Sequence, residues 1–195
     1  MDSFSLRKAR ADELQRLLGI DDEASELFTR AGLTFTTDAN HPFSVAESAR
    51  WAKAIEEQLA HVAVNHQDEP IGFVTLSFVD QEPYLDQISV LPGVMQRGIG
   101  TMLLRHAISW SNGRPLWLTT YSHLSWNKPF YERRGFTAVA EGTCGPELRA
   151  ILQEQRAVLP DPHHRVAMVH CPLAYGAQVP YPGRVHSQVL DSWDG

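Results

Sequence analysis

The sequence predicts an α/β domain built around a mixed sheet, with antiparallel strands early in the chain and helical crossovers between later strands. Residues 60–66 (AHVAVNH) and 71–79 (IGFVTLSFV) are strand-like and are joined by the turn QDEP, which is the pattern of a hairpin. After residue 84, strand-like segments alternate with helical ones. The 195 residues, 43% of them hydrophobic, are enough for one sizeable core.

The first part of the chain is expected to supply one strand and two helices. Residues 3–9 alternate as a strand does. Asp12 can cap the helix that follows, whose apolar residues keep helical spacing. Ser44 opens a second helix over residues 44–58, and Glu47 stands three residues further on, as in a capping box.

The later part of the chain predicts strands separated by helices. Together with the first part it forms a single expected domain over residues 1–173, and residues 174–195 are expected to be an irregular C-terminal tail with little periodicity. The later elements are strands at 84–91, 115–121, 135–141 and 165–173, and helices at about 98–111, 126–134 and 145–158.

The composition excludes several classes of function. A net charge of −6 leaves no overall basic surface, so we expect no nucleic-acid partner. Cys144 and Cys171 stand far apart in the sequence, and neither a disulfide framework nor a zinc site is expected. The nine histidines form no H-x-x-x-H pair, so no metal is expected. The first residues lack a signal-peptide core and no run of about 18 apolar residues occurs, so we expect a cytoplasmic protein without a membrane partner.

Residues 94–104 (VMQRGIGTMLL) form a glycine-rich turn that leads from a predicted strand into a helix. Glycine lets the backbone approach a ligand closely, and a helix N-terminus offers free N–H groups and a positive dipole end to phosphate. A plain strand-to-helix turn is the alternative for so short a motif. A Rossmann fingerprint would need a third glycine where Leu103 stands, and a P-loop would need G-K-[ST], which is missing.

Two segments together resemble the GNAT superfamily of acetyl-CoA-dependent N-acetyltransferases. Residues 85–104 (LDQISVLPGVMQRGIGTMLL) are similar to that family's strand, Q/R-x-x-G-x-G/A loop and helix, and residues 126–136 (WNKPFYERRGF) are similar to its N…FYxxxGF segment. Met95 departs from the pattern, because the family usually has Gln or Arg there. The resemblance covers roughly residues 3–173 and implies a GNAT-like mixed, largely antiparallel central sheet flanked by helices.

The resemblance also implies acetyl-CoA as the co-substrate, beside the end of strand 84–91, where a bulge parts that strand from the next one. Backbone groups of Ser89 and Val90 would bond the pantetheine arm. Asn127 would hold the cofactor through its amide, cap the helix that begins there, or do both. The pyrophosphate would lie on the segment Gln96, Arg97, Gly98, Ile99, Gly100 and Thr101, with further positive charge from Lys128 and Arg133.

Tyr131 is the residue that the resemblance implies as the general acid. A phenol with a pKa of about 10 can protonate a departing thiolate whose thiol has a pKa of about 8.5. Alternatively, Tyr131 simply packs the short helix, as Phe130 is expected to do.

Asp86 is the expected acceptor-side carboxylate, which takes the proton of the amine directly or through water, or attracts the ammonium. Glu82, in the preceding loop, is the alternative base, and a structural charge is the other alternative for each carboxylate. Strict alternation along strand 84–91 would direct Tyr84, Asp86, Ile88 and Val90 to one face and Leu85, Gln87 and Ser89 to the other.

The expected function is transfer of an acetyl group from acetyl-CoA to a primary amine of a small molecule or peptide, by direct attack. A non-catalytic acyl-CoA-binding or sensor domain with the same fold is the alternative. Phe35, Phe43 and Trp126 stand in or beside the loops that flank the implied acceptor cleft, where they either line the cleft or pack the core. The sequence names neither the amine nor the oligomeric state, and a homodimer is one possibility.

Overall fold

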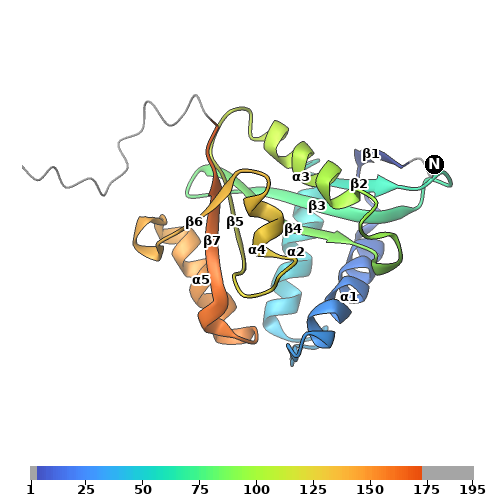
Figure 1. Cartoon of the computed structure of the whole chain (residues 1–195). Helices are drawn as coiled ribbons and strands as arrows, with labels where there is room; N and C mark the ends of the chain where they lie inside the picture. The colour runs from blue at the N-terminus through green and yellow to red at the C-terminus, as the bar shows by residue number, and fades with distance from the viewer. Residues whose placement is uncertain (1–3, 173–195) are drawn as a thin grey trace, which may run out of the picture.

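Seven strands form one sheet in the part of the chain that the structure describes, residues 4–172 of the computed structural model, and α-helices cover both faces of it (Figure 1). The strands are β1 (Ser5–Lys8), β2 (Ala60–Val64), β3 (Pro70–Val79), β4 (Glu82–Val90), β5 (Leu116–Tyr121), β6 (Phe136–Val139) and β7 (Arg165–His170). The α-helices are α1 (Leu14–Arg30), α2 (Pro42–Glu56), α3 (Ile99–Trp110), α4 (Lys128–Glu132) and α5 (Pro146–Val158).

The strand order is β1-β2-β3-β4-β5-β7-β6. β4 and β5 run parallel, and every other neighbouring pair within residues 4–172 is antiparallel. This mixed and largely antiparallel sheet confirms the predicted fold class. The predicted tail, residues 174–195, lies outside the described residues.

The two faces of the sheet carry separate apolar cores. α3 and α4 pack on one face, where Leu103, Leu104 and Tyr131 join the largest buried cluster. α1 and α2 pack on the opposite face at the β1–β3 end, and α5 covers that face at the β7 end (Figure 1). Among the described helices, none is both long and apolar enough to pass through a bilayer.

A β-bulge in β4 changes which way its side chains point. Thr75 of β3 pairs with Gln87 but the next residue pairs with Leu85, so Asp86 is the extra residue. Asp86 contacts α2, and Gln87 contacts α1, on the same face of the sheet. The predicted alternation is therefore wrong beyond Asp86. Gln87 and Ser89 share the face of Asp86, whereas Ile88 and Val90 pack in the core beneath α3.

Three predicted element starts are wrong, each for a local reason. β4 begins at Glu82, because Asp80 and Gln81 alone form the turn, both with positive φ (52° and 64°). α2 begins at Pro42 and not at Ser44, because proline suits the first helical position and the His41 ring accepts the N–H of Phe43 at 3.1 Å. The expected capping box is therefore absent from α2, and the Glu47 side chain is free to face the interior.

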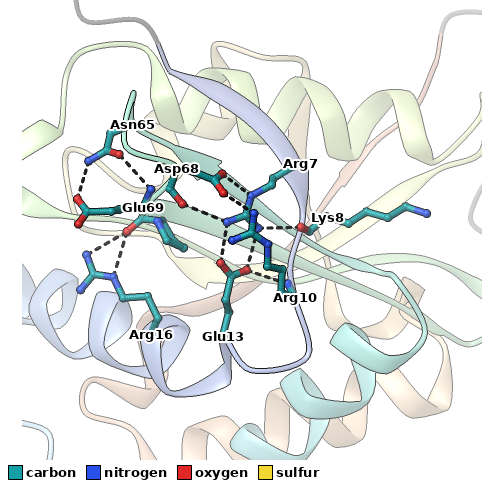
Figure 2. Close-up of polar contacts among 9 residues, drawn as sticks. Arg7, Lys8, Arg10, Glu13, Arg16, Asn65, Asp68 and Glu69 are labelled. Atoms are coloured by element: carbon teal, nitrogen blue, oxygen red, sulfur yellow. Dashed lines mark hydrogen bonds and ion pairs between the residues drawn. The ribbon is translucent and has the colours of Figure 1, made fainter.

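The predicted cap of α1 is also wrong. The residue at that position is Glu13, and its carboxylate reaches backward to accept the N–H of Arg10 at 2.8 Å. The same carboxylate accepts two bonds from the Arg7 guanidinium, at 2.9 and 2.7 Å. Arg7 also donates to Asp68 in the β2–β3 turn at 2.7 Å (Figure 2). This network fastens the start of α1 to β1 and to that turn, and so fixes the helix against the sheet.

We predict that Glu13→Gln lowers the free energy of unfolding by about 1.5–3 kcal/mol at pH 7, because it weakens hydrogen bonds between charged groups. The Arg7 guanidinium holds the pKa of Glu13 below its usual range. A lowered folded-state pKa gives stability that is present above the unfolded pKa of about 4.3 and is lost as the pH falls through the folded value. Urea unfolding at several pH values should therefore show the difference between the two proteins narrowing below about pH 4.3.

Glu26→Gln is the matched control, because the i,i+4 pair of Glu26 with Arg30 is exposed on both sides. We expect that substitution to cost no more than about 0.5 kcal/mol. Equal losses for the two variants would contradict a fastening role for Glu13.

Candidate active site

A large cleft in the described residues follows the line along which β4 and β5 separate. The two strands share one paired position, Tyr84 opposite Trp117, and then part. The cleft measures about 1490 Å³, above the usual range of about 300–1000 Å³ for small-molecule sites. Side chains from α1, α2, β4 and β5 line it, together with the N-terminus of α3 and parts of α4 and α5. This volume can hold two ligands end to end.

The edge of β4 that faces β5 offers unpaired backbone groups. Leu91 donates its N–H to Ile71 at 3.0 Å, so the backbone groups of Leu91 point toward β3. Along an antiparallel strand, the N–H and C=O groups of one residue point to the neighbouring strand and those of the next residue point away from it. The N–H and C=O groups of Val90 and Ile88 therefore point away from β3, into the cleft. Ser89, which pairs with Phe73 of β3, lines the cleft from between them.

The glycine-rich turn after β4 forms a cradle of N–H groups. Gln96 and Gly98 both have positive φ (63° and 91°), and α3 starts immediately afterwards. The first intrahelical bond runs from Met102 to Gly98 at 2.9 Å, which leaves the N–H groups of the first turn of α3 without helical acceptors. A Cβ built on Gly98 meets no protein atom within 4 Å, so the space beside it is open. Such a cradle suits a phosphate group.

Most of the residues expected to bind the cofactor line this cleft. Arg97 is the exception, since it is exposed and is not part of the cleft wall. Asn127 stands at the cap position of α4 without a capping hydrogen bond from its side chain, so its amide is free to face the cleft. The lining residues are Ser89, Val90, Gln96, Gly98, Ile99, Gly100, Thr101 and Asn127.

The positively charged residues that line the cleft near the glycine-rich turn are not the ones expected from the sequence. Arg133 lines the cleft, whereas Lys128 pairs with Glu132 at 3.0 Å and does not. Arg134 was not predicted. It lies 4.0 Å over the Phe130 ring and donates to the Thr101 hydroxyl at 2.5 Å. The pair of arginines in FYERRGF was a signal for a cation here, but the sequence does not say which of them faces the ligand.

Asp86 lies in the cleft wall, on the face of the sheet that α2 covers. Its carboxylate pairs with the Arg50 guanidinium at 3.4 Å. Burial raises the pKa of Asp86, although the charge of Arg50 opposes this. Glu82, the alternative base, lies at the far end of β4 and pairs with Arg114 at 3.2 Å, outside this cleft.

Two more carboxylates that sequence analysis missed stand beside Asp86. Asp21 of α1 accepts hydrogen bonds from Gln87 Nε2 and Ser89 Oγ, both at 2.5 Å, and burial raises its pKa. Burial, followed by the negative charge of Asp21, raises the pKa of Glu47 to about 8. Neither residue could be found without the correct start of α2 and the bulge in β4.

Tyr131 of α4 lines the cleft and is only 6% exposed. Its ring packs edge-on against Phe130 and Phe136, and burial raises the pKa of its phenol. Tyr131 therefore does pack the short helix, which was the alternative to a role as general acid. A residue that packs there and also lines the cleft can have both roles.

Arg165, which opens β7, completes the wall at the α5 end. The guanidinium donates to Thr119 Oγ1 at 3.1 Å and to Gln155 Oε1 at 2.6 Å. It also lies 4.7 Å over the Tyr121 ring. No sequence motif pointed to this residue, because its neighbours come from two other elements, β5 and α5, that are distant from it in the sequence.

Aromatic side chains form the outer wall on the acceptor side. Phe35, Phe43 and Trp126 all line the cleft. Phe28 joins them, with its ring 6.0 Å from Phe35 and 6.3 Å from Trp126. Trp51 also lines the cleft but is 1% exposed, and its ring packs against Phe73 in the core. Within residues 4–172, no three His, Cys, Asp or Glu side chains gather in a way that could hold a metal ion.

Comparison with known proteins identifies the kind of site. Residues 22–136, more than half of the chain, match the model of the acetyltransferase (GNAT) family. The chain is 30% identical over 140 residues to the peptidyl-lysine N-acetyltransferase YjaB of Salmonella typhimurium, an alignment that covers 68% of this chain and 83% of that protein.

Solved structures show the same fold. The PaiA N-acetyltransferase of Thermoplasma acidophilum, in complex with coenzyme A, has a TM-score of 0.63 at 18% identity, covering 87% of this chain and 99% of that one. The solution structure of apo YjaB from Escherichia coli has a TM-score of 0.56 at 20% identity, covering 86% of this chain and 97% of that one.

Proposed function

This chain belongs to the GNAT acetyltransferase family, and we propose that it transfers the acetyl group of acetyl-CoA to a primary amine by direct attack, without a covalent enzyme intermediate. The observation that carries the proposal is the cleft between β4 and β5, which has an N–H cradle at one end and three carboxylates at the other. The family model and the curated relative are both acetyltransferases. Neither finding favours the alternative of a non-catalytic acyl-CoA sensor.

The donor half of the cleft has the groups that acetyl-CoA needs. We assign the pyrophosphate to the cradle at Gln96–Thr101, with Arg133 and Arg134 beside it. The outward N–H and C=O groups of Ile88 and Val90 would pair with the amides of the pantetheine arm, as an added strand would. The PaiA structure was solved in complex with coenzyme A, which supports coenzyme A as the group carried by the donor of this fold.

The reaction needs groups at the carbonyl, the sulfur and the amine. Acetyl-CoA supplies a thioester whose carbonyl carbon accepts the nitrogen lone pair and whose C–S bond then breaks. A backbone N–H on the free edge of β4 polarises the carbonyl oxygen. Tyr131 donates its phenolic proton to the departing sulfur, and solvent later restores that proton.

The amine must lose a proton before or as it attacks. We propose that Glu47 takes this proton, because a base works best when its pKa lies near the working pH. Asp86 stays on the acceptor side, where its negative charge attracts the ammonium and raises the pKa of Glu47. A peptide lysine, the acceptor named for YjaB, and a small primary amine both satisfy this arrangement.

Acetyl-CoA should stabilise the protein by about 2.7 kcal/mol when present at 100 times its dissociation constant. Gly98→Val should abolish this gain, because a side chain there occupies the open space beside the cradle. The positive φ of Gly98 also costs the free variant about 1–2 kcal/mol, so the measurement is the shift in melting temperature between free and ligand-bound forms of each protein.

Gly93→Val is the control for this experiment, since a Cβ at Gly93 is also unobstructed but φ there is not in the left-handed region. That variant should keep the full shift. A full shift in Gly98→Val as well would mean that the phosphate lies elsewhere.

Tyr131→Phe should lower kcat by about 10²- to 10⁴-fold, the usual contribution of a positioned general acid. The ring and its packing remain, so the affinity for acetyl-CoA should change little. The loss should shrink with an acyl donor whose thiol is more acidic, because a better leaving group needs the proton less. Normal turnover in Tyr131→Phe, with chemistry rate-limiting, would leave only the packing role.

The pH dependence of kcat/KM should report Glu47. Activity should rise with pH through about 8, because only the ionised carboxylate accepts the proton. Asp86→Asn removes a negative charge that raises the pKa of Glu47, so this rise should move to lower pH. Glu47→Gln should remove the rise and lower the rate by about 10²-fold or more. An unchanged pH profile in Glu47→Gln would assign the proton transfer to water or to another group. The control is Glu56→Gln, an exposed change in the same helix, which should leave the pH profile and the rate unchanged.

A further inference from the structure

Arg165 is a buried cation whose partners are all neutral. Its exposure is 9%, and it lines the cleft at the α5 end. Its hydrogen bonds go to the Thr119 hydroxyl and the Gln155 amide oxygen, and its plane covers the Tyr121 ring. Within residues 4–172 it forms no ion pair with a carboxylate, and its Nε has no hydrogen-bond partner.

Such an arrangement is costly unless a ligand completes it. Arginine keeps its charge in proteins, and removing an unpaired charge from water costs several kcal/mol even after the protein relaxes. The guanidinium is also the group that best matches the planar geometry of a carboxylate. Arg165 therefore has the burial and the unpaired charge of a carboxylate-binding residue, at the wall of the cleft.

The position of Arg165 separates it from the donor half of the cleft. Its contacts are with β5 and α5, on the face opposite α3, whereas the phosphate cradle opens α3. Its charge lowers the pKa of Glu47, so the two side chains lie close enough to interact electrostatically. The same cleft thus presents a cation and a group of carboxylates to one ligand.

We propose that Arg165 binds a carboxylate of the acceptor, so that the acceptor is an amino acid or a short peptide whose free carboxylate lies a few bonds from the reacting amine. The ammonium end faces Glu47 and Asp86, and the carboxylate end forms an ion pair with the guanidinium. Thr119 and Gln155 hold that guanidinium in place. This assignment rests on the proposed acetyl transfer for the identity of the amine, but the carboxylate site itself can be tested by binding alone.

The test is calorimetric titration of the CoA-saturated protein with free L-amino acids and dipeptides, each paired with its C-terminal carboxamide. At least one acid should bind about 30-fold or more tightly than its amide, the effect of removing one partner of a buried charge pair. In Arg165→Gln the preference should fall toward unity, and in Arg165→Lys part of it should remain. Arg149→Gln, an exposed change on α5, should keep the full preference. The amino acid and dipeptide arms distinguish the two sources of carboxylate.

The comparison of each acid with its carboxamide in the wild-type protein tests the proposal even if Arg165→Gln fails to fold. Absence of any such preference in the wild type would overturn the proposal, and so would equal weakening of acid and amide in Arg165→Lys. Release of CoA, followed with a thiol-reactive dye, tests acetyl transfer separately from the carboxylate site at Arg165. Selective binding of an acid without acetyl transfer would refute the proposed function alone. Faster acetylation of an internal lysine in a carboxamide-capped peptide than of every acid would refute the carboxylate site alone.

Discussion

The bulge at Asp86 is the constraint on which the rest of the site depends. One extra residue in β4 moves Gln87 and Ser89 onto the face of Asp86, so both reach Asp21 of α1. A bulge also bends and twists its strand, and β4 is paired with β5 at one position only. The bulge is therefore associated with two features of the cleft. One is the free edge of β4, where we propose that the donor binds, and the other is the group of carboxylates, where we propose that the acceptor binds.

Electrostatics divides the cleft into two halves although the whole chain carries a net charge of −6. The donor half has the N–H cradle and two arginines, Arg133 and Arg134. The acceptor half has Asp21, Glu47 and Asp86, each with a pKa raised mainly by burial. Buried carboxylates close together cannot all ionise, so this half is prepared to receive either a cation or a proton. In the proposed mechanism, the same cluster therefore both binds the amine and accepts its proton.

The parts of the site that the sequence predicted well are those encoded locally. The segment from β4 into α3 supplies a strand edge, a turn with two positive-φ residues and a helix start within about two dozen residues, and each is a short-range property. Tyr131 and Asn127 are recognisable for the same reason. The alternation along β4 failed because a bulge leaves no mark on a period-2 pattern. Glu47 was assigned to a capping box because Ser44 and Glu47 fit that motif, whereas Pro42 and His41 start the helix in fact.

Apart from Asp86, the charged residues of the acceptor half could not be predicted, because they are not close together in the sequence. Asp21, Glu47, Asp86 and Arg165 come from α1, α2, β4 and β7, and only the packing of the sheet brings them together. Arg7, Glu13 and Asp68 contribute to that packing from well outside the cleft, since they fix the start of the helix that carries Asp21 (Figure 2). A relative that is 30% identical shares the family's reaction, but the acceptor depends on side chains that such an alignment does not have to preserve. The identity of the amine must therefore be inferred from the charges of this half of the cleft, where a buried arginine and three carboxylates line the same wall.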